Sequence, residues 1–277
     1  MNRPIEFWKV EAVGNDFVLV HESVGGEGDW AGLARAACKR RIGIGADGLL
    51  VVSPNDEGLA MRMFNPDGTE DFCGNGMRCA AAHGFEQGWV GREFVILHGG
   101  RTVPTEVSPS GIVTTRIPPA SFEPAEVPLI GEPLIDATLD VAGYRYRATA
   151  LTTGSTHTIL ACETLPDDVE VRAVGPALEH DPRFPDRTSI IWSVVSGEAT
   201  LQIRIWERGA GETLGCGTGS SAAAVVWGRL EGRRGPVTVH NPGGDVVVDF
   251  DRWEGPLALS SGAKTTYRGT WLPGPGR

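Results

Sequence analysis

The sequence has no long hydrophobic run. Charged residues interrupt its first segment, MNRPIEFWKVEAVGNDF, every few positions. A secretion signal needs an apolar core of about 7 to 15 residues, and a membrane-spanning helix needs roughly 20. The sequence offers neither, so we expect a cytoplasmic protein with no membrane partner.

Clustered positive charge is also scarce. The 25 Lys and Arg residues are outnumbered by 35 Asp and Glu residues, which gives a formal net charge of -10 at pH 7. The only clusters of Lys or Arg are the short runs at 39–41 and 233–234. Nucleic-acid binding depends on a basic face that replaces the counterions of the phosphates. We therefore expect no nucleic-acid partner.

Cysteines are few, and none forms a C-x-x-C pair. There are five, an odd number, at positions 38, 73, 79, 162 and 216. In a chain without a secretion signal this pattern argues against a disulfide framework and against a zinc site, so we expect reduced thiols and no metal ion. Cys38, Cys79 and Cys162 lie in apolar segments without a glycine turn, which predicts ordinary packing for them.

The residues that are present predict a folded, strand-rich protein. Of the 277 residues 41% are hydrophobic, which is enough for a sizeable core, and the 38 glycines and 19 prolines are scattered. Apolar or alternating runs bounded by turn residues predict strands at 17–20, 48–52, 59–64, 94–97, 200–206, 237–240 and 245–250. Helices are predicted at 30–41, 74–87, 168–179 and 217–230.

The chain contains an internal repeat. CGNGMRCAAA, which begins at Cys73, aligns with CGTGSSAAAV, which begins at Cys216, 143 residues later. The match continues upstream, because a polar residue, Asn65 or Arg208, and then a glycine precede each cysteine at the same offsets. Two related halves are implied. The proline-rich segment 116–133 marks the crossover between them.

We therefore expect an α+β fold of two pseudo-symmetric domains. The first is predicted to span 1–118 and to carry Cys73. The second is predicted to span 119–263 and to carry Cys216. The C-terminal segment, 264–277, is expected to pack on the first domain.

The repeated motif places a thiol at the mouth of a helix. Unpaired N–H groups and the positive end of the helix dipole favour the thiolate there, which predicts a pKa below the usual value of about 8.5. The same N–H groups can bind a carboxylate, because glycine and small residues leave them open. A lone cysteine at a glycine turn is more often an inert buried residue, but the duplication of the motif favours chemistry.

Two such sites predict a two-base racemase. If both helix N-termini held one carboxylate, Cys73 and Cys216 would lie on opposite sides of one alpha carbon. One thiolate would remove the alpha proton while the other thiol delivered a proton to the opposite face. Helix dipoles and the exclusion of water would stabilise the carbanion. This chemistry requires no cofactor, neither a metal nor pyridoxal phosphate.

Six segments of the chain resemble the diaminopimelate epimerase family. They are GNDFVLV (14–20), RRIGIGADGLL (40–50), FNPDGTEDFCGNGMRC (64–79), LEHDPRFPDR (178–187), WERGAGETLGCGTGSSAAA (206–224) and NPGG (241–244). The two cysteine blocks favour this family over the proline racemases. The resemblance implies a pyridoxal-independent enzyme that interconverts LL- and meso-diaminopimelate. It also implies that each half wraps a mixed or antiparallel sheet around a central helix.

The resemblance further implies roles for single residues. Cys73 and Cys216 match the acid/base pair of the family. The reacting carboxylate is implied to be held by backbone N–H groups of Gly74, Asn75, Gly217 and Thr218. Substrate contacts are implied for Asn15, Asn65, Glu207 and Arg208.

Of these, Glu207 and Arg208 are implied to bind the distal end of the substrate. A zwitterion offers a carboxylate to the guanidinium and an ammonium to the carboxylate. Glu207 and His157 are also implied to adjust the thiol pKa values. For His157 an alternative has equal weight: it is a structural residue on a strand, with its polar atoms hydrogen-bonded.

Three positions depart from the family pattern. Ser155 and Ser189 stand where the family usually has asparagine, and Gly48 stands where it usually has glutamine. Serine is shorter than asparagine and lacks an amide that donates and accepts at once. The substrate therefore stays open: diaminopimelate is the first choice, another amino acid such as histidine is the second, and a non-catalytic amino-acid-binding protein is the third. Pairing into a homodimer also stays open.

Overall fold

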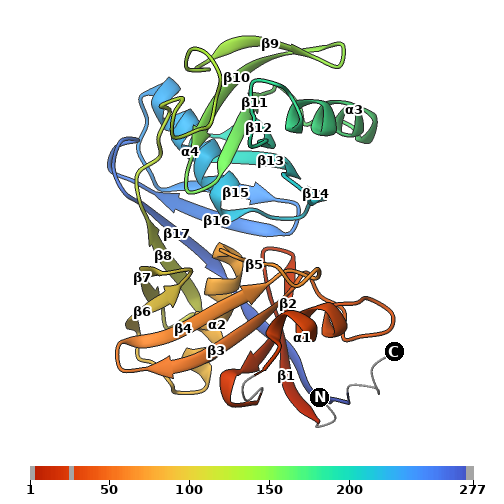
Figure 1. Cartoon of the computed structure of the whole chain (residues 1–277). Helices are drawn as coiled ribbons and strands as arrows, with labels where there is room; N and C mark the ends of the chain where they lie inside the picture. The colour runs from red at the N-terminus through yellow and green to blue at the C-terminus, as the bar shows by residue number, and fades with distance from the viewer. Residues whose placement is uncertain (1–3, 25–27, 273–277) are drawn as a thin grey trace. The chain divides into compact units, whose positions relative to one another are not determined.

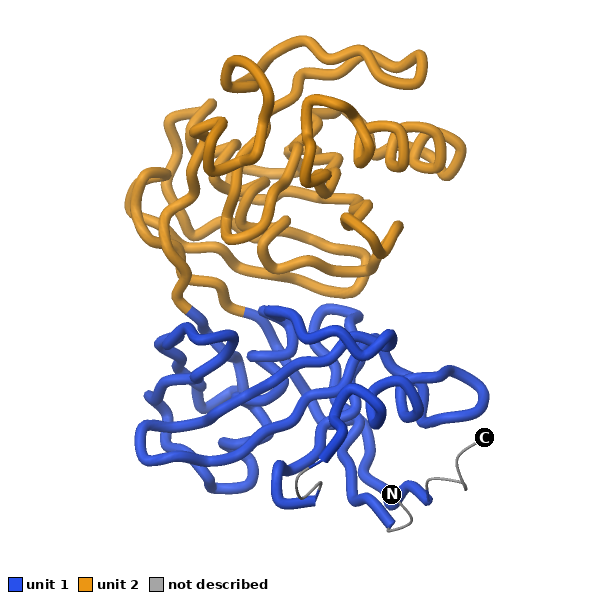
Figure 2. Tube along the Cα trace, viewed as in Figure 1, with its two compact units in different colours: residues 1–115, 261–277 blue, residues 116–260 orange. Residues whose placement is uncertain are grey.

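The computed structural model describes residues 4–24 and 28–272. The chain divides into two compact units (Figure 2): unit 1 is Met1–Thr115 with Ser261–Arg277, and unit 2 is Arg116–Ser260. The sequence predicts these divisions a few residues later, at 118/119 and 263/264. Residues 273–277 of the predicted C-terminal segment lie outside the described residues.

Unit 1 is a mixed sheet with one long helix packed on it (Figure 1). Its helices are α1 (Trp30–Ala37) and α2 (Gly74–Glu86), with a 3-10 turn at Glu22–Val24. Its strands are β1 (Ile5–Ala12), β2 (Asn15–His21), β3 (Gly48–Asn55), β4 (Gly58–Phe64), β5 (Glu70–Asp71), β6 (Glu93–His98), β7 (Arg101–Val107), β8 (Ile112–Ile117), whose end enters unit 2, and β18 (Lys264–Trp271). Strand β18 pairs with β1, so the C-terminal segment completes the first sheet.

Unit 2 repeats this plan with two further helices. These are α3 (Asp168–Glu179) and α4 (Gly217–Glu231). Its strands are β9 (Ala137–Val141), β10 (Tyr144–Thr152), β11 (Thr156–Ala161), β12 (Ser189–Gly197), β13 (Thr200–Glu207), β14 (Gly211–Thr213), β15 (Val237–Asn241), β16 (Gly244–Asp249) and β17 (Leu257–Gly262), whose end enters unit 1.

The strand pairings show that the two units share one topology. In unit 1, β2 runs parallel to β3, β3 is antiparallel to β4, and β4 is parallel to β6. In unit 2, β11, β12, β13 and β15 follow the same sequence of pairings. A short strand, β5 or β14, precedes the long helix in each unit. The predicted α+β fold of two related halves is therefore confirmed.

The long helices are largely buried, and small residues let them pack closely against their sheets. Ala80, Ala81 and Gly84 let α2 pack against strands of unit 1, and the AAAVV run at 222–226 does the same for α4 in unit 2. Each unit thus has a helix at its centre, and the cysteine of the repeat lies directly before that helix.

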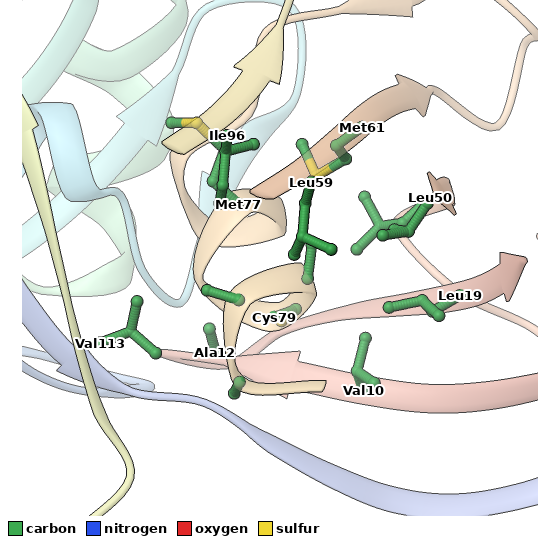
Figure 3. Packing of buried hydrophobic residues seen from close by; sticks show 14 of the residues in the cluster. Val10, Ala12, Leu19, Leu50, Leu59, Met61, Met77, Cys79, Ile96 and Val113 are labelled. Carbon is green, nitrogen blue, oxygen red and sulfur yellow. The ribbon is translucent and has the colours of Figure 1, made fainter. Parts of the chain in front are cut away.

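Figure 3 shows the core that fixes α2 in place. Met77 and Cys79 on the helix belong to one buried cluster with Leu50 on β3, Leu59 on β4 and Ile96 on β6. Burying each large apolar side chain contributes about 1.5–3 kcal/mol. The core therefore fixes the position of α2, and Cys73 lies directly before its first turn.

Helix α1 ends earlier than the sequence predicts. It stops at Ala37, with Cys38 as its C-cap, whereas the prediction continued to Arg41. The backbone N–H groups of Ile44 and Gly45 both donate to the Ala37 carbonyl, so the chain folds back over the end of the helix. Arg41 has a left-handed backbone with φ of 80°. The other three helices agree with their predictions to within one residue. No helix in the described parts of the chain is long and apolar enough to span a membrane.

Candidate active site

The two repeated cysteines are the N-caps of α2 and α4. Their backbones are nearly identical, with φ of -136° at both and ψ of 109° at Cys73 and 113° at Cys216. The Sγ atom of Cys73 accepts the N–H of Gly76 at 3.3 Å, and that of Cys216 accepts the N–H of Gly219 at 3.4 Å. Each sulfur therefore lies at the positive end of a buried helix dipole.

Close packing explains the second glycine of each Cys-Gly-x-Gly motif. A Cβ at Gly76 would lie 2.8 Å from Leu50 Cδ2, and one at Gly219 would lie 2.7 Å from Ile191 Cδ1. Both distances are shorter than normal contacts between carbon atoms. A larger residue would therefore require Leu50 or Ile191, or the first helical turn itself, to move.

A side chain from a neighbouring strand holds the backbone N–H of each cysteine. His98 Nε2, at the end of β6, accepts the Cys73 N–H at 2.9 Å, and Asn241 Oδ1, at the end of β15, accepts the Cys216 N–H at 3.3 Å. Both acceptors come 25 residues after their cysteine. Sequence reasoning missed both residues, although the equal offset within the repeat is a signal that could have found them.

The imidazole of His98 is suited to this acceptor role. Its Nδ1 lies 3.0 Å from the Met61 carbonyl oxygen, which only accepts, so Nδ1 carries the proton and Nε2 keeps its lone pair. Burial lowers the pKa of His98, which keeps the ring neutral. The ring also stacks on Phe72, with centroids 4.8 Å apart.

The loss of this acceptor is expected to destabilise the fold measurably. His98→Ala should lower the free energy of unfolding by about 2–3 kcal/mol, because it removes packed atoms and leaves the Cys73 N–H unpaired. His98→Asn supplies the acceptor that the second unit uses and should cost less. Urea unfolding followed by circular dichroism measures both variants, with His180→Ala, at an exposed histidine, as control. Equal stability of His98→Ala and the wild type would contradict the role.

In unit 1, three of the predicted residues come together. Asn75 Nδ2 lies 3.4 Å from Asn15 Oδ1, and Asn15 Nδ2 donates to Asp47 Oδ2 at 2.6 Å. Asn75 follows Cys73 in the first turn of α2. Another predicted residue, Asn65, lies in the turn after β4, and its Nδ2 donates to Thr69 Oγ1 at 3.1 Å.

In unit 2, Cys216 is buried, with 7% of its surface exposed. Burial is the largest cause of a raised thiol pKa, and the nearby Glu207 carboxylate raises it further. The Thr218 hydroxyl and the Gly219 N–H act in the opposite direction but are weaker. The predicted lowering of the Cys216 pKa is therefore wrong for this structure, because loss of hydration outweighs the helix N-terminus. Cys216 is a thiol here.

His157 lies on β11, in the same unit as this thiol. The residue is 1% exposed, and its Nε2 lies 2.9 Å from Ser155 Oγ. Burial, with a smaller contribution from the positive charge of Arg208, lowers the pKa of His157 to about 3. The imidazole is therefore neutral. Unit 2 thus brings together Cys216, Thr218, His157 and Glu207, with Arg208 close enough to act on His157 by its charge.

Two positions that depart from the family pattern, Ser189 and Gly48, make contacts within the protein. Ser189 Oγ accepts the backbone N–H of Arg208 at 3.1 Å, and the Arg208 guanidinium donates to the Asp186 carbonyl at 2.9 Å. A Cβ at Gly48 would lie 2.8 Å from Met63 Cε. Position 48 therefore takes no side chain unless Met63 moves, and the serine at 189 orients the backbone of a predicted substrate residue.

The remaining cysteines pack within the two units. Burial raises the pKa of Cys38 to about 12 and that of Cys162 to about 11, and it raises the pKa of Cys79 as well. None of the five cysteines, all of which lie in the described residues, forms a disulfide. Within residues 4–24 and 28–272, no group of three or more His, Cys, Asp or Glu side chains is arranged to hold a metal ion.

Solved structures with the same fold define the class. A PhzF-family phenazine biosynthesis protein from Bacillus anthracis matches with a TM-score of 0.70 and 19% identity, and the match covers 98% of this chain and 99% of that one. A hydroxyproline epimerase from Agrobacterium vitis matches with a TM-score of 0.69 and 13% identity, over 98% and 92% of the two chains. The fold is therefore the one shared by PhzF-family proteins and epimerases of this kind.

Sequence relatives identify the family within this class. The family model described as diaminopimelate epimerase matches residues 7–117 and 149–264. A diaminopimelate epimerase from Moorella thermoacetica is 38% identical over 286 residues, which cover 96% of this chain and 98% of that protein. One from Desulfitobacterium hafniense is 35% identical over 97% of this chain and 98% of its own length. The chain belongs to the diaminopimelate epimerase family and is an isomerase.

Proposed function

We propose that this protein interconverts LL- and meso-diaminopimelate by a two-base thiol mechanism without a cofactor. The observation that carries the proposal is the matched pair of cysteines, Cys73 and Cys216, each capping a central helix in one of two units of the same topology. The names of the relatives support the substrate. The reaction belongs to lysine biosynthesis, and we expect it in the cytoplasm.

In the proposed reaction both cysteines act on one alpha carbon. The thiolate of one cysteine takes the alpha proton, so that the C–H bond breaks and an S–H bond forms. The thiol of the other cysteine gives its proton to the opposite face, and its sulfur becomes the thiolate. Each turnover therefore exchanges the roles of the two sulfurs and inverts the carbon.

The two helix N-termini would stabilise the carbanion. Backbone N–H groups at Gly74, Asn75, Gly217 and Thr218 are the donors for the alpha carboxylate, onto which negative charge delocalises as the proton leaves. Such donors cost no reorganisation, because α2 and α4 are already fixed by their cores.

The distal end of the substrate is assigned to other residues. Arg208 would pair with the distal carboxylate and Glu207 with the distal ammonium, while Asn15 and Asn65 would add hydrogen bonds. A zwitterion at both ends of the substrate distinguishes diaminopimelate from most amino acids.

A second candidate is racemisation of another amino acid, such as histidine. Ser155 and Ser189 favour it, because both are shorter than asparagine, and both hydroxyls already bond to protein groups. A site that offers fewer amides to the substrate would accept a different polar side chain.

Solvent isotope exchange tests the proposal. Incubation with LL-diaminopimelate in deuterated water should place deuterium at one alpha carbon and produce the meso isomer, as measured by mass spectrometry and chiral chromatography. A panel of L-amino acids in the same assay separates the two candidate substrates. Binding of diaminopimelate without exchange, together with no exchange in the panel, would support a non-catalytic binding protein and contradict the enzyme.

A further inference from the structure

Ser155 joins a buried histidine to the cysteine of unit 2. It lies in the turn between β10 and β11, and its Oγ is 2.9 Å from His157 Nε2 and 3.2 Å from Thr218 Oγ1. Thr218 Oγ1 is in turn 3.4 Å from Cys216 Sγ. A continuous hydrogen-bond path therefore runs from the imidazole through two hydroxyl groups to the sulfur.

The surroundings hold the members of this path in position. The Thr153 hydroxyl donates to the Thr218 carbonyl at 2.9 Å, which fixes the backbone beside the thiol. Strand β11 sets His157 by pairing with β10 on one side and with β12 on the other. The turn that carries Ser155 thus reaches Thr218 from a fixed sheet, and not from a long loop.

The direction of the hydrogen bonds follows from the neutral imidazole. A neutral histidine carries one ring proton, and Nδ1 of His157 has no hydrogen-bond partner within the described chain. A proton on Nδ1 would be a buried donor without an acceptor, whereas a proton on Nε2 is accepted by Ser155. The contacts therefore assign the proton to Nε2.

With that proton on Nε2, the direction of the hydrogen bond that each hydroxyl donates is fixed. Ser155 Oγ accepts from His157 and donates to Thr218 Oγ1. Thr218 Oγ1 accepts from Ser155 and donates to Cys216 Sγ. A donor directed at sulfur stabilises the thiolate more than the thiol, because the hydrogen bond to a charged acceptor is stronger.

We propose that Ser155 is a positioning residue for Cys216: it links the His157 imidazole to the Thr218 hydroxyl and so keeps the proton of that hydroxyl directed at the sulfur. Its part in turnover rests on the proposed function, because only a thiol that cycles through thiolate gains from such a donor. The hydroxyl relay itself is a property of the free protein.

Three charged or titratable groups bear on this thiol. Glu207 disfavours the thiolate by its negative charge, while burial, and to a smaller extent the positive charge of Arg208, keeps His157 neutral. The relay opposes Glu207 with a donor that carries no net charge. Loss of the relay should therefore make the Cys216 thiolate harder to form, without any change at Cys73.

The pH dependence of alkylation measures this directly. Iodoacetamide reacts with the thiolate, so the rate at each pH, resolved by peptide mass spectrometry, reports Cys216 and Cys73 separately in one sample. Ser155→Ala and Thr218→Val should raise the midpoint for Cys216 by about one pH unit and slow its alkylation at pH 8 about tenfold. Thr218→Ser, which retains the hydroxyl, should restore the wild-type midpoint.

Controls separate the relay from general damage. Ser196→Ala, at an exposed serine near the end of β12, is the matched control and should leave both profiles unchanged. Because Ser155 acts through Thr218, the double variant should resemble Thr218→Val alone. An unchanged Cys216 midpoint in Thr218→Val, an equal shift at Cys73, or additive shifts in the double variant would overturn the proposal. Absence of isotope exchange in the wild type would instead contradict the proposed function, and would leave the alkylation result intact.

Discussion

Replacing either Cys73 or Cys216 with alanine is expected to abolish net epimerisation of diaminopimelate, with kcat falling by about 10³-fold or more. Each sulfur is the only group that the mechanism assigns to its face of the alpha carbon. No second acid or base shares the task, so neither loss can be compensated. Chiral chromatography of the product, with enzyme in large excess, measures the residual rate.

The single variants should also reveal which stereoisomer each cysteine faces. With one thiol left, that sulfur can remove the alpha proton of one isomer and return a deuteron to the same face. Exchange without inversion is therefore expected for one isomer in Cys73→Ala and for the other isomer in Cys216→Ala. Exchange of the same isomer in both variants would contradict opposed bases.

Cys79→Ala is the matched control for this experiment. Cys79 lies in the same helix as Cys73, is 1% exposed and packs in the core of unit 1. Burial raises its pKa, and Cys79 lies within α2 and not at its N-terminus, so we expect it to take no part in proton transfer. The Cys79→Ala variant should therefore epimerise diaminopimelate at the wild-type rate. A wild-type rate in either Cys73→Ala or Cys216→Ala would disprove the two-base mechanism.

The repeat in the sequence predicts more of this fold than the local patterns do. Aligning the two Cys-Gly-x-Gly motifs implies equivalent helices, and the structure extends the equivalence to whole strand pairings on either side. The helix ends were predictable where caps and glycines mark them. The end of α1 was not, because the basic run after Ala37 is typical of a helix C-terminus, whereas tertiary hydrogen bonds from residues 44 and 45 close the helix earlier.

The electrostatics of the site could not be predicted from the motif. A helix N-terminus lowers a thiol pKa in partly exposed settings, but the depth of burial depends on residues far away in sequence. At Cys216 burial outweighs the helix N-terminus, so the thiol pKa is raised. His98 and Asn241 were missed for a similar reason: their role depends on where strands β6 and β15 end, and only the common offset from each cysteine records it.

His83 gives the fold a dependence on acid that the active site does not explain. It lies on α2 between Trp8 and Trp89, with ring centroids 4.7 Å and 5.3 Å away, and is 1% exposed. Neither ring nitrogen has a hydrogen-bond partner within the described residues. Burial lowers the pKa of His83 to about 4. The folded protein therefore holds a neutral imidazole that the unfolded chain would protonate near pH 6.5.

The sign of the effect follows from proton binding. Between about pH 6.5 and pH 4 the unfolded state binds more protons than the folded state, so stability rises with pH in this window. The contribution of the neutral His83 to stability is complete above pH 6.5 and is lost as the pH falls toward 4. From these two pKa values, His83 alone should cost about 2 kcal/mol of unfolding free energy at pH 5 relative to pH 7.5.

His83→Phe keeps a flat ring between the two tryptophans and removes the titration. Urea unfolding at pH 7.5 and pH 5.0 should show that the variant loses about 2 kcal/mol less than the wild type, while His180→Phe, at an exposed histidine, should match the wild type. The variant should also be more stable at pH 7.5, because two unpaired polar atoms leave the core. Some acid sensitivity should persist, since His157 also has a lowered pKa, of about 3. If wild type and His83→Phe lose equal stability on acidification, His83 is not the source of that loss.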